Sequence, residues 1–112
     1  MKYKIVLVPF PFNDLSSQKV RPAICLTDEI HPFGHIVLAF ITSRIFANTS
    51  DTDFVVEAKD ANFVETGLKV SSTIRLHRLI TISKTIIRRE LGEMSKDKHK
   101  EVENRLRKLF KI

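Results

Sequence analysis

The chain has 112 residues, of which 43% are hydrophobic and 29% charged, and its formal net charge is +6 at pH 7. This size fits one domain with a real core, and the composition excludes a disordered chain. The positive charge favours a polyanionic partner, nucleic acid ahead of an anionic membrane surface. No segment approaches the roughly 20 apolar residues of a membrane span. The single cysteine, Cys25, excludes a disulfide within the chain, so a cytoplasmic protein is expected.

The first quarter of the chain predicts two strands joined by a polar loop. Residues 5–8 (IVLV) are a short apolar run rich in β-branched side chains, and residues 20–27 form a second apolar run. Pro9 and Pro11 cannot donate to a sheet ladder, so strand pairing is expected to loosen there. Residues 13–18 (NDLSSQ) have the composition of a loop. Arg21 therefore begins the second strand, where Pro22 restricts its backbone.

Residues 35–42 (HIVLAFIT) form the clearest strand in the sequence. Apolar side chains fall on both of its faces, which is typical of a strand in the middle of a sheet. The strand ends in the polar run Thr42-Ser43-Arg44. A short further strand is expected over residues 54–58, followed by a connection in which Gly67 supplies a special backbone angle.

Residues 70–82 predict a long alternating strand. The alternation places Arg75 and His77 on one face, so that a cation lies next to an imidazole. The opposite face is expected to join the core, apart from Arg78, with four apolar residues: Ile74, Leu76, Ile80 and Ile82.

The end of the chain predicts one amphipathic helix. Residues 85–92 are expected to form a turn and a short strand, after which Ser95 resembles a helix N-cap. From residue 84 to 112, ten Lys or Arg stand against five Asp or Glu, which gives +5 of the net +6. The helix would pack on the sheet through an apolar stripe of Val102, Leu106, Leu109 and Phe110. Several short strands followed by one helix predict a mainly β protein, a small and strongly bent β-barrel.

Polar residues at the predicted strand ends form a set that suits phosphate chemistry. An arginine neutralises a phosphate, a hydroxyl donates to a phosphate oxygen, and a histidine moves a proton near neutral pH. With three glycines and one cysteine, the chain has neither a phosphate-binding glycine loop nor a Cys/His zinc cluster, so no metal or cofactor is expected. Metal-free cleavage of RNA, in which the substrate's 2′-hydroxyl is the nucleophile, fits this set: Arg21, Thr42, Ser43, Arg75 and His77.

Five stretches together resemble the PemK/MazF family of toxin endoribonucleases from bacterial type II toxin–antitoxin modules. They are residues 5–27 (IVLVPFPFNDLSSQKVRPAICLT), 35–44 (HIVLAFITSR), 53–56 (DFVV), 65–84 (ETGLKVSSTIRLHRLITISK) and 91–95 (LGEMS). The resemblance implies one toxin domain over residues 1–112, an SH3-like barrel with a C-terminal helix, acting as a homodimer. It also implies metal-independent, sequence-specific cleavage of single-stranded RNA to 2′,3′-cyclic phosphate and 5′-hydroxyl ends, with inhibition by a cognate antitoxin.

The resemblance assigns roles to individual residues. Arg21 matches the family's catalytic arginine and Thr42 its catalytic threonine, with Ser43 adjacent. Arg75 matches a position that some members use for phosphate contact or catalysis. His77 stands where some members carry an acid, and we interpret it as a general acid or base. Further contacts to RNA are expected from Asn13, Lys19 and Arg44.

The opening of the chain departs from the family. Members usually carry Gly-Asp just before the first strand, and this chain has Tyr3-Lys4, so the hydrogen bonds that order the N-terminus are expected to differ. Two other functions stay open on the same scaffold: a poison of DNA gyrase that acts through its C-terminal helix, and a non-catalytic nucleic-acid-binding regulator. The presence of both Arg21 and Thr42 favours the nuclease.

Overall fold

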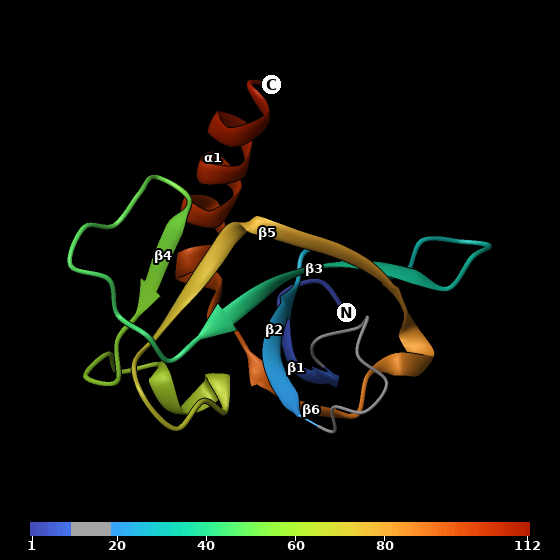
Figure 1. Ribbon diagram of the computed structural model, residues 1–112, viewed down its shortest axis with the longest axis horizontal. Coiled ribbons are helices and arrows are strands. Elements are labelled where there is room, and N and C mark those ends of the chain that lie inside the picture. Colours follow the sequence, from blue (N-terminus) through green and yellow to red (C-terminus); the bar gives the residue numbers. More distant parts are fainter. Residues whose placement is uncertain (10–18) are drawn as a thin grey trace.

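A curled antiparallel sheet of six strands carries one α-helix at its C-terminal end (Figure 1). The computed structural model describes residues 1–9 and 19–112. The strand order in the sheet is β4-β5-β3-β2-β1-β6. This half-barrel confirms the predicted mainly β, strongly bent fold. The strands are β1 (Lys4–Pro9), β2 (Val20–Cys25), β3 (His35–Thr42), β4 (Asp53–Val56), β5 (Ser72–Ser83) and β6 (Arg89–Glu93).

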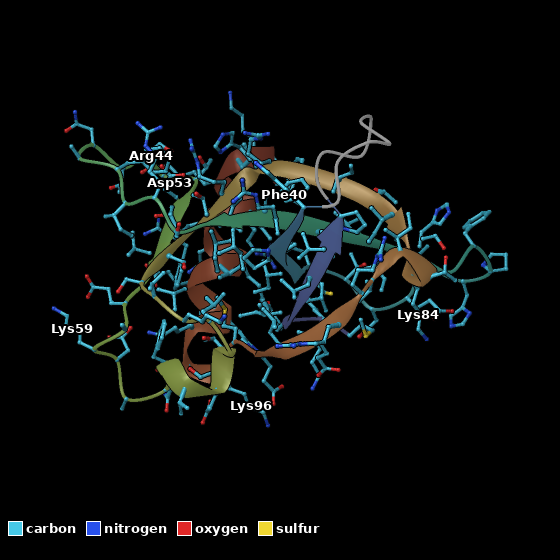
Figure 2. The ribbon with its side chains drawn as sticks, turned by 60° about the horizontal axis from the view of Figure 1, so that its bottom comes forward. Phe40, Arg44, Asp53, Lys59, Lys84 and Lys96 are labelled. Atoms are coloured by element: carbon cyan, nitrogen blue, oxygen red, sulfur yellow. The ribbon has the colours of Figure 1, made fainter. Side chains whose placement is uncertain are left out.

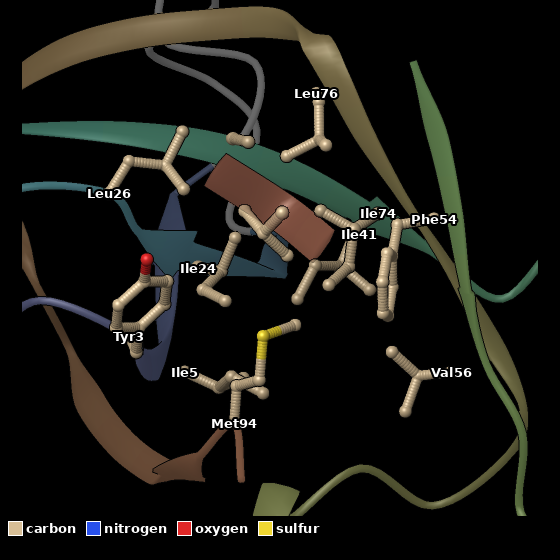
Figure 3. Close-up of a cluster of buried hydrophobic side chains, with 12 residues drawn as sticks. Tyr3, Ile5, Ile24, Leu26, Ile41, Phe54, Val56, Ile74, Leu76 and Met94 are labelled. Atoms are coloured by element: carbon tan, nitrogen blue, oxygen red, sulfur yellow. The ribbon is translucent and has the colours of Figure 1, made fainter. Parts of the chain in front are cut away.

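The sheet separates two hydrophobic clusters, because successive side chains of a strand point to opposite faces. On β1, Ile5 joins the first cluster while Val6 and Val8 join the second. The first cluster also includes residues of β2, β3, β4, β5 and the C-terminal helix (Figure 3), and Leu91 of β6 packs against it. β3 lies between β2 and β5 and contributes buried side chains to both clusters, so the predicted central position of this strand is confirmed.

Cys25 lies in the second cluster with no exposed surface. Burial raises the pKa of its thiol to about 11, which keeps it protonated and unreactive at neutral pH. Cys25 therefore packs as a small buried hydrophobe.

The alternation of β5 is interrupted midway, where the strand bends (Figure 1). In the β3–β5 register, Phe40 lies opposite Arg75, whereas the adjacent Ala39 lies opposite Leu79. Residues 76–78 are therefore extra on the β5 side, and this odd number reverses the phase of the strand. Leu76 accordingly packs in the first cluster and Ile82 in the second. The prediction that all four apolar residues of this strand share one face is wrong.

The C-terminal helix begins later than predicted. Ser95 precedes a 3₁₀ turn at Lys96–Lys98, where its hydroxyl donates to the Asp97 carboxylate, and the helix α1 spans His99–Phe110. Val102 is fully buried in the first cluster, but Phe110 is 55% exposed, so the apolar stripe reaches the core only through its first part. Among the residues that the structure describes, no helix has the length and apolar character to cross a membrane.

Tyr3 occupies the turn before β1 with a φ of +72°, in the left-handed region that glycine adopts without strain. Its ring stacks on His99 of α1 with centroids 3.6 Å apart. Its hydroxyl donates a 2.5 Å hydrogen bond to Glu103 Oε2. Tyr3 therefore holds a backbone conformation that glycine adopts more readily, while its side chain ties the start of the chain to α1.

Candidate active site groove

The strand registers bring the principal predicted site residues to one end and one face of the sheet. Ala23 lies opposite Phe40 in the β2–β3 register, so continuing that register by two residues places Arg21 opposite Thr42. On the other side of β3, Phe40 lies opposite Arg75. Because Arg21, Thr42 and Arg75 are each in phase with Phe40, all three project from the same face.

A groove with a volume of about 690 Å³ opens at this place. It is formed by residues of all the strands except β4 and by the segments that follow β3 and precede β5. Among residues 1–9 and 19–112, its lining includes no Asp or Glu and six cationic side chains: Arg21, Arg44, Lys69, Arg75, Arg78 and Arg89. Such a surface attracts anions and suits the phosphate groups of a nucleic-acid backbone.

The hydroxyl of Thr42 is held by the turn that ends β3. Its Oγ1 accepts a 3.2 Å hydrogen bond from the backbone N–H of Arg44. The backbone carbonyl of Arg44 in turn accepts a 2.9 Å bond from Thr73 Oγ1 of the neighbouring strand. Because the Thr42 oxygen accepts in this turn, its hydrogen remains available to donate to a ligand in the groove.

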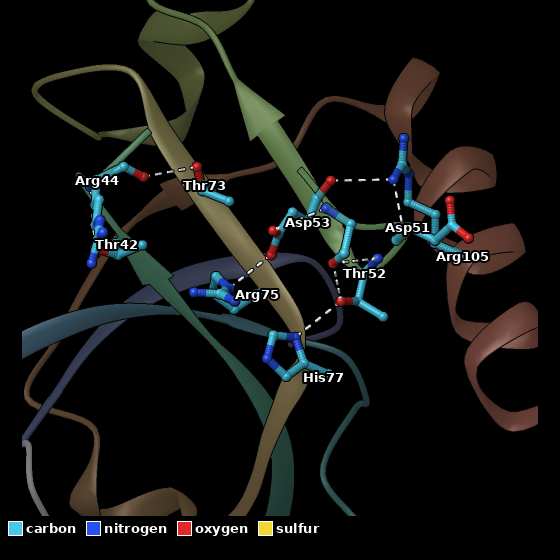
Figure 4. Close-up of polar contacts among 10 residues, drawn as sticks. Thr42, Arg44, Asp51, Thr52, Asp53, Thr73, Arg75, His77 and Arg105 are labelled. Atoms are coloured by element: carbon cyan, nitrogen blue, oxygen red, sulfur yellow. Dashed lines mark hydrogen bonds and ion pairs between the residues drawn. The ribbon is translucent and has the colours of Figure 1, made fainter. Parts of the chain in front are cut away.

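Arg75 is held by two groups from other segments, the Asp53 carboxylate and the Phe46 ring. Its Nε lies 2.7 Å from Oδ1 of Asp53, whose side chain is only 3% exposed, as an ion pair without the angle of a hydrogen bond (Figure 4). Its guanidinium carbon lies 4.2 Å from the ring centroid of Phe46, and that of Arg44 lies 4.8 Å from the same ring. Figure 2 shows Arg44 and Asp53 at one end of the sheet, opposite the end that carries Lys84.

Five of the eight predicted site residues line this groove: Arg21, Thr42, Ser43, Arg44 and Arg75. Lys19 is exposed and does not line it, and Asn13 lies outside the described residues. His77 does not line it either. Its Nδ1 lies 3.0 Å from Thr52 Oγ1, which itself bonds to Ser50, so the ring belongs to a row of hydroxyls beside β4 (Figure 4).

Sequence reasoning missed three of the cations in the groove, Lys69, Arg78 and Arg89. Arg78 was expected on the opposite face of its strand from Arg75, and the bulge at residues 76–78 brings it to the same groove. It also missed Asp53 and Phe46, because their roles depend on contacts with Arg75 from other segments of the chain. Within residues 1–9 and 19–112, no group of three or more His, Cys, Asp or Glu side chains is arranged to hold a metal ion.

Comparison with protein families shows to which family the chain belongs. Residues 1–110 match the model of the PemK-like, MazF-like toxin of type II toxin–antitoxin system. The chain belongs to this toxin family. No curated protein sequence matches it.

Solved structures of MazF toxins share the fold. The Mycobacterium tuberculosis toxin MazF-mt6 superposes with a TM-score of 0.73 at 20% identity over 97% of both chains. MazF of Deinococcus radiodurans gives 0.72 at 21% identity over 99% of this chain and 96% of its own. A mycobacterial endoribonuclease in complex with its cognate antitoxin gives 0.74 at 11% identity over 100% of this chain and 95% of its own.

Proposed function

We propose that this PemK/MazF-family toxin is an endoribonuclease that binds single-stranded RNA in the basic groove. The observation that carries the proposal is the juxtaposition of Arg21, Thr42 and Arg75 on one face of the sheet, in a groove whose described lining residues include no carboxylate. The proposal places the protein in the cytoplasm as a homodimer, with mRNA as its substrate. A cognate antitoxin whose extended acidic segment fills the same groove would block it.

The proposed reaction uses the substrate's own nucleophile. The 2′-hydroxyl oxygen attacks the neighbouring phosphorus and loses its proton to a base, while the bond from phosphorus to the 5′ oxygen breaks and that oxygen gains a proton. The products are a 2′,3′-cyclic phosphate and a 5′-hydroxyl. Arg21 stabilises the negative charge that develops on the phosphorane, and Arg75 neutralises the phosphate, because guanidinium groups bind phosphate oxygens well. The Thr42 hydroxyl donates to a non-bridging oxygen. None of these steps requires a metal.

Removal of the two principal groups tests the catalytic assignment. We expect Arg21→Ala and Thr42→Val each to lower the cleavage rate by about 100-fold or more, since both remove a donor to transition-state charge. The measurement is cleavage of single-stranded RNA in EDTA, with analysis of the product ends. Arg107→Ala and Thr81→Val remove the same groups from exposed positions outside the groove and serve as matched controls.

The same assay separates the alternatives. Cyclic-phosphate ends that disappear in Arg21→Ala support the ribonuclease. Intact RNA together with growth arrest and capture of DNA gyrase would instead indicate a gyrase poison. Salt-sensitive RNA binding without any cleavage would indicate a non-catalytic regulator.

The role of His77 as proton carrier has its own test. A histidine that moves the proton makes the cleavage rate depend on its protonation state, and therefore on pH. His77→Ala would then lower the rate and remove that pH dependence. An unchanged rate and pH profile would restrict His77 to its structural contact with Thr52 and leave proton transfer to groups within the groove.

A further inference from the structure

The position of Arg75 depends on two residues that the proposed chemistry does not use. The geometry points to Asp53 and Phe46 as positioning residues that hold the Arg75 guanidinium in its working orientation at the groove. This inference rests on the proposed ribonuclease function, in which Arg75 neutralises the scissile phosphate.

Asp53 is a buried carboxylate and its contact with Arg75 differs from a surface ion pair. The two residues lie directly opposite each other in the β4–β5 register. The Asp53 side chain is 3% exposed and that of Arg75 is 25% exposed. A carboxylate removed from water needs a paired charge, and the Arg75 Nε at 2.7 Å provides it. Its second oxygen accepts a 3.4 Å bond from the Ser50 backbone N–H, which limits rotation of the carboxylate.

Phe46 sets the plane of the guanidinium. The Arg75 guanidinium carbon lies 4.2 Å from the centre of its ring, well within the range of a cation–π contact. The ion pair at Nε and the aromatic contact together restrict the planar group from two directions. Among the residues that the structure describes, neither terminal nitrogen of Arg75 has a hydrogen-bond partner in the protein, so both are available for a bidentate contact to phosphate.

The backbone that carries Asp53 is itself fixed by the C-terminal helix. Arg105 of α1 donates from one terminal nitrogen to the carbonyls of Asp51, at 2.8 Å, and Asp53, at 3.2 Å (Figure 4). The neighbouring pair between Lys108 and the Asp51 carboxylate, at 2.7 Å, has side chains that are 69% and 72% exposed, so it contributes little to holding this backbone. A continuous set of contacts therefore runs from α1 through Asp53 to Arg75, and the helix contributes to the site without touching RNA.

The test compares two variants that each remove one negative charge from neighbouring positions of the chain. Asp53→Asn keeps the shape of the side chain and deletes the charge beside Arg75, whereas Asp51→Asn deletes a charge that faces Lys108. We expect Asp53→Asn to lower kcat for RNA cleavage by about 100-fold, as a small misplacement of a catalytic group does. KM and the affinity for an RNA with a 2′-deoxy scissile nucleotide should change little, and Asp51→Asn should retain the wild-type rate.

Two further measurements test whether Asp53 affects cleavage through Arg75. The double variant D53N/R75A should cleave no more slowly than Arg75→Ala alone, because Asp53 acts only through Arg75. The Nε–H signal of Arg75 in ¹H–¹⁵N spectra should shift and exchange faster in Asp53→Asn. Phe46→Leu, which removes the ring and leaves the ion pair, should also lower kcat, and it supplies the test if Asp53→Asn does not fold.

Wild-type cleavage by Asp53→Asn, additive losses in the double variant, or an unchanged Arg75 Nε–H signal would each overturn the inference. If the wild-type protein cleaves no RNA, the proposed function fails, while the Arg75 signal still reports whether Asp53 positions the arginine. The two failures are therefore distinguishable.

Discussion

Tyr3 shows how one residue meets two demands that are usually separate. Its backbone takes the left-handed conformation at φ +72°, which costs a non-glycine residue about 1–2 kcal/mol. Its ring packs on His99 and is 93% buried, with 7% of its surface exposed. The contacts with α1 therefore offset the backbone strain and explain how the chain folds without the glycine expected in its family.

The hydrogen bond from Tyr3 to Glu103 gives stability a defined dependence on pH. Burial and then this bond raise the pKa of Tyr3, and the same bond lowers the pKa of Glu103. Because the pKa of the Glu103 carboxyl is lower in the folded protein, this group stabilises the fold at pH values above its unfolded pKa of about 4.3. That stabilisation is lost as the pH falls through the folded pKa. Because the pKa of Tyr3 is higher in the folded protein, this group stabilises the fold at pH values below its unfolded pKa of about 10. That stabilisation is lost as the pH rises through the folded pKa.

We therefore expect Tyr3→Phe to be less stable than wild type in urea unfolding from about pH 5 to pH 9, with a difference that shrinks at either extreme. Glu103→Gln is the paired control, and the double variant should resemble the singles because they share one bond. A difference that stayed constant from pH 3 to pH 9 would mean that the bond does not control this dependence.

At the residue scale, the sequence was sufficient for the groups that carry the proposed chemistry. Arg21, Thr42 and Arg75 stand in or beside predicted strands, so their phase and the family resemblance located them together. Asp53 and Phe46 could not be found in this way, because their importance arises from a cross-strand pair and a ring contact between segments distant in the chain. Side-chain contacts of this kind have no periodic signal in a sequence.

At the scale of elements, the positions of the strands along the chain followed from local sequence patterns. Each predicted strand exists, and both faces of residues 35–42 are buried as expected. The bulge of β5 was missed because residues 76–78 (LHR) contain no glycine or proline to mark it. The alternation of apolar and polar residues also continues through them without a break. The late start of α1 was missed because a 3₁₀ turn and an α-helix share the same N-terminal residue preferences.

The contact between β6 and the 3₁₀ turn at Phe63–Thr66 depends on two glycines, each of which lies against the backbone of the other segment. A Cβ added to Gly67 would lie 2.1 Å from the carbonyl oxygen of Leu91, and one added to Gly92 would lie 2.2 Å from that of Glu65. Backbone atoms cannot move aside as a flexible side chain can. This close approach brings Gly67 and Leu91 into the lining of the groove.

A pair of glycine substitutions separates backbone strain from this contact. Gly34 has φ +69° with nothing within 4 Å of an added Cβ, so Gly34→Ala should cost only the strain of about 1–2 kcal/mol. Gly67→Ala has similar strain at φ +73° and a steric clash, which should add about 1–3 kcal/mol. Free energies of unfolding in urea measure both. Equal losses would mean that β6 and the turn separate at little cost.

At the scale of the whole molecule, the charge is arranged in two regions with different surroundings. The described lining of the groove gathers six cations without a carboxylate, whereas α1 pairs two of its cations with acids of the chain, Arg105 with Glu101 and Lys108 with Asp51. Of these two regions, the groove is the one whose described lining holds no acidic side chain to offset its positive charge. Its cations belong to distant parts of the sequence, which is why the charge count alone pointed to the helix.

Salt dependence of RNA binding tests this division. Each phosphate contact to single-stranded nucleic acid contributes about −0.7 to the slope of log K against log salt, so six contacts set a limit of about −4. Arg78→Ala should reduce the magnitude of the slope by about 0.7 for a noncleavable RNA. Lys100→Ala, on the exposed surface of α1, should leave it unchanged. A larger effect from the helix would place the RNA there instead.

The only cysteine of the chain sits at the centre of the second hydrophobic cluster, with 0% of its surface exposed. A thiol reagent therefore reaches its sulfur only after the groups that cover Cys25 move apart, and the raised thiol pKa of about 11 leaves little of the reactive thiolate at neutral pH. The rate at which Cys25 is labelled reports how often this part of the core opens, without any engineered probe.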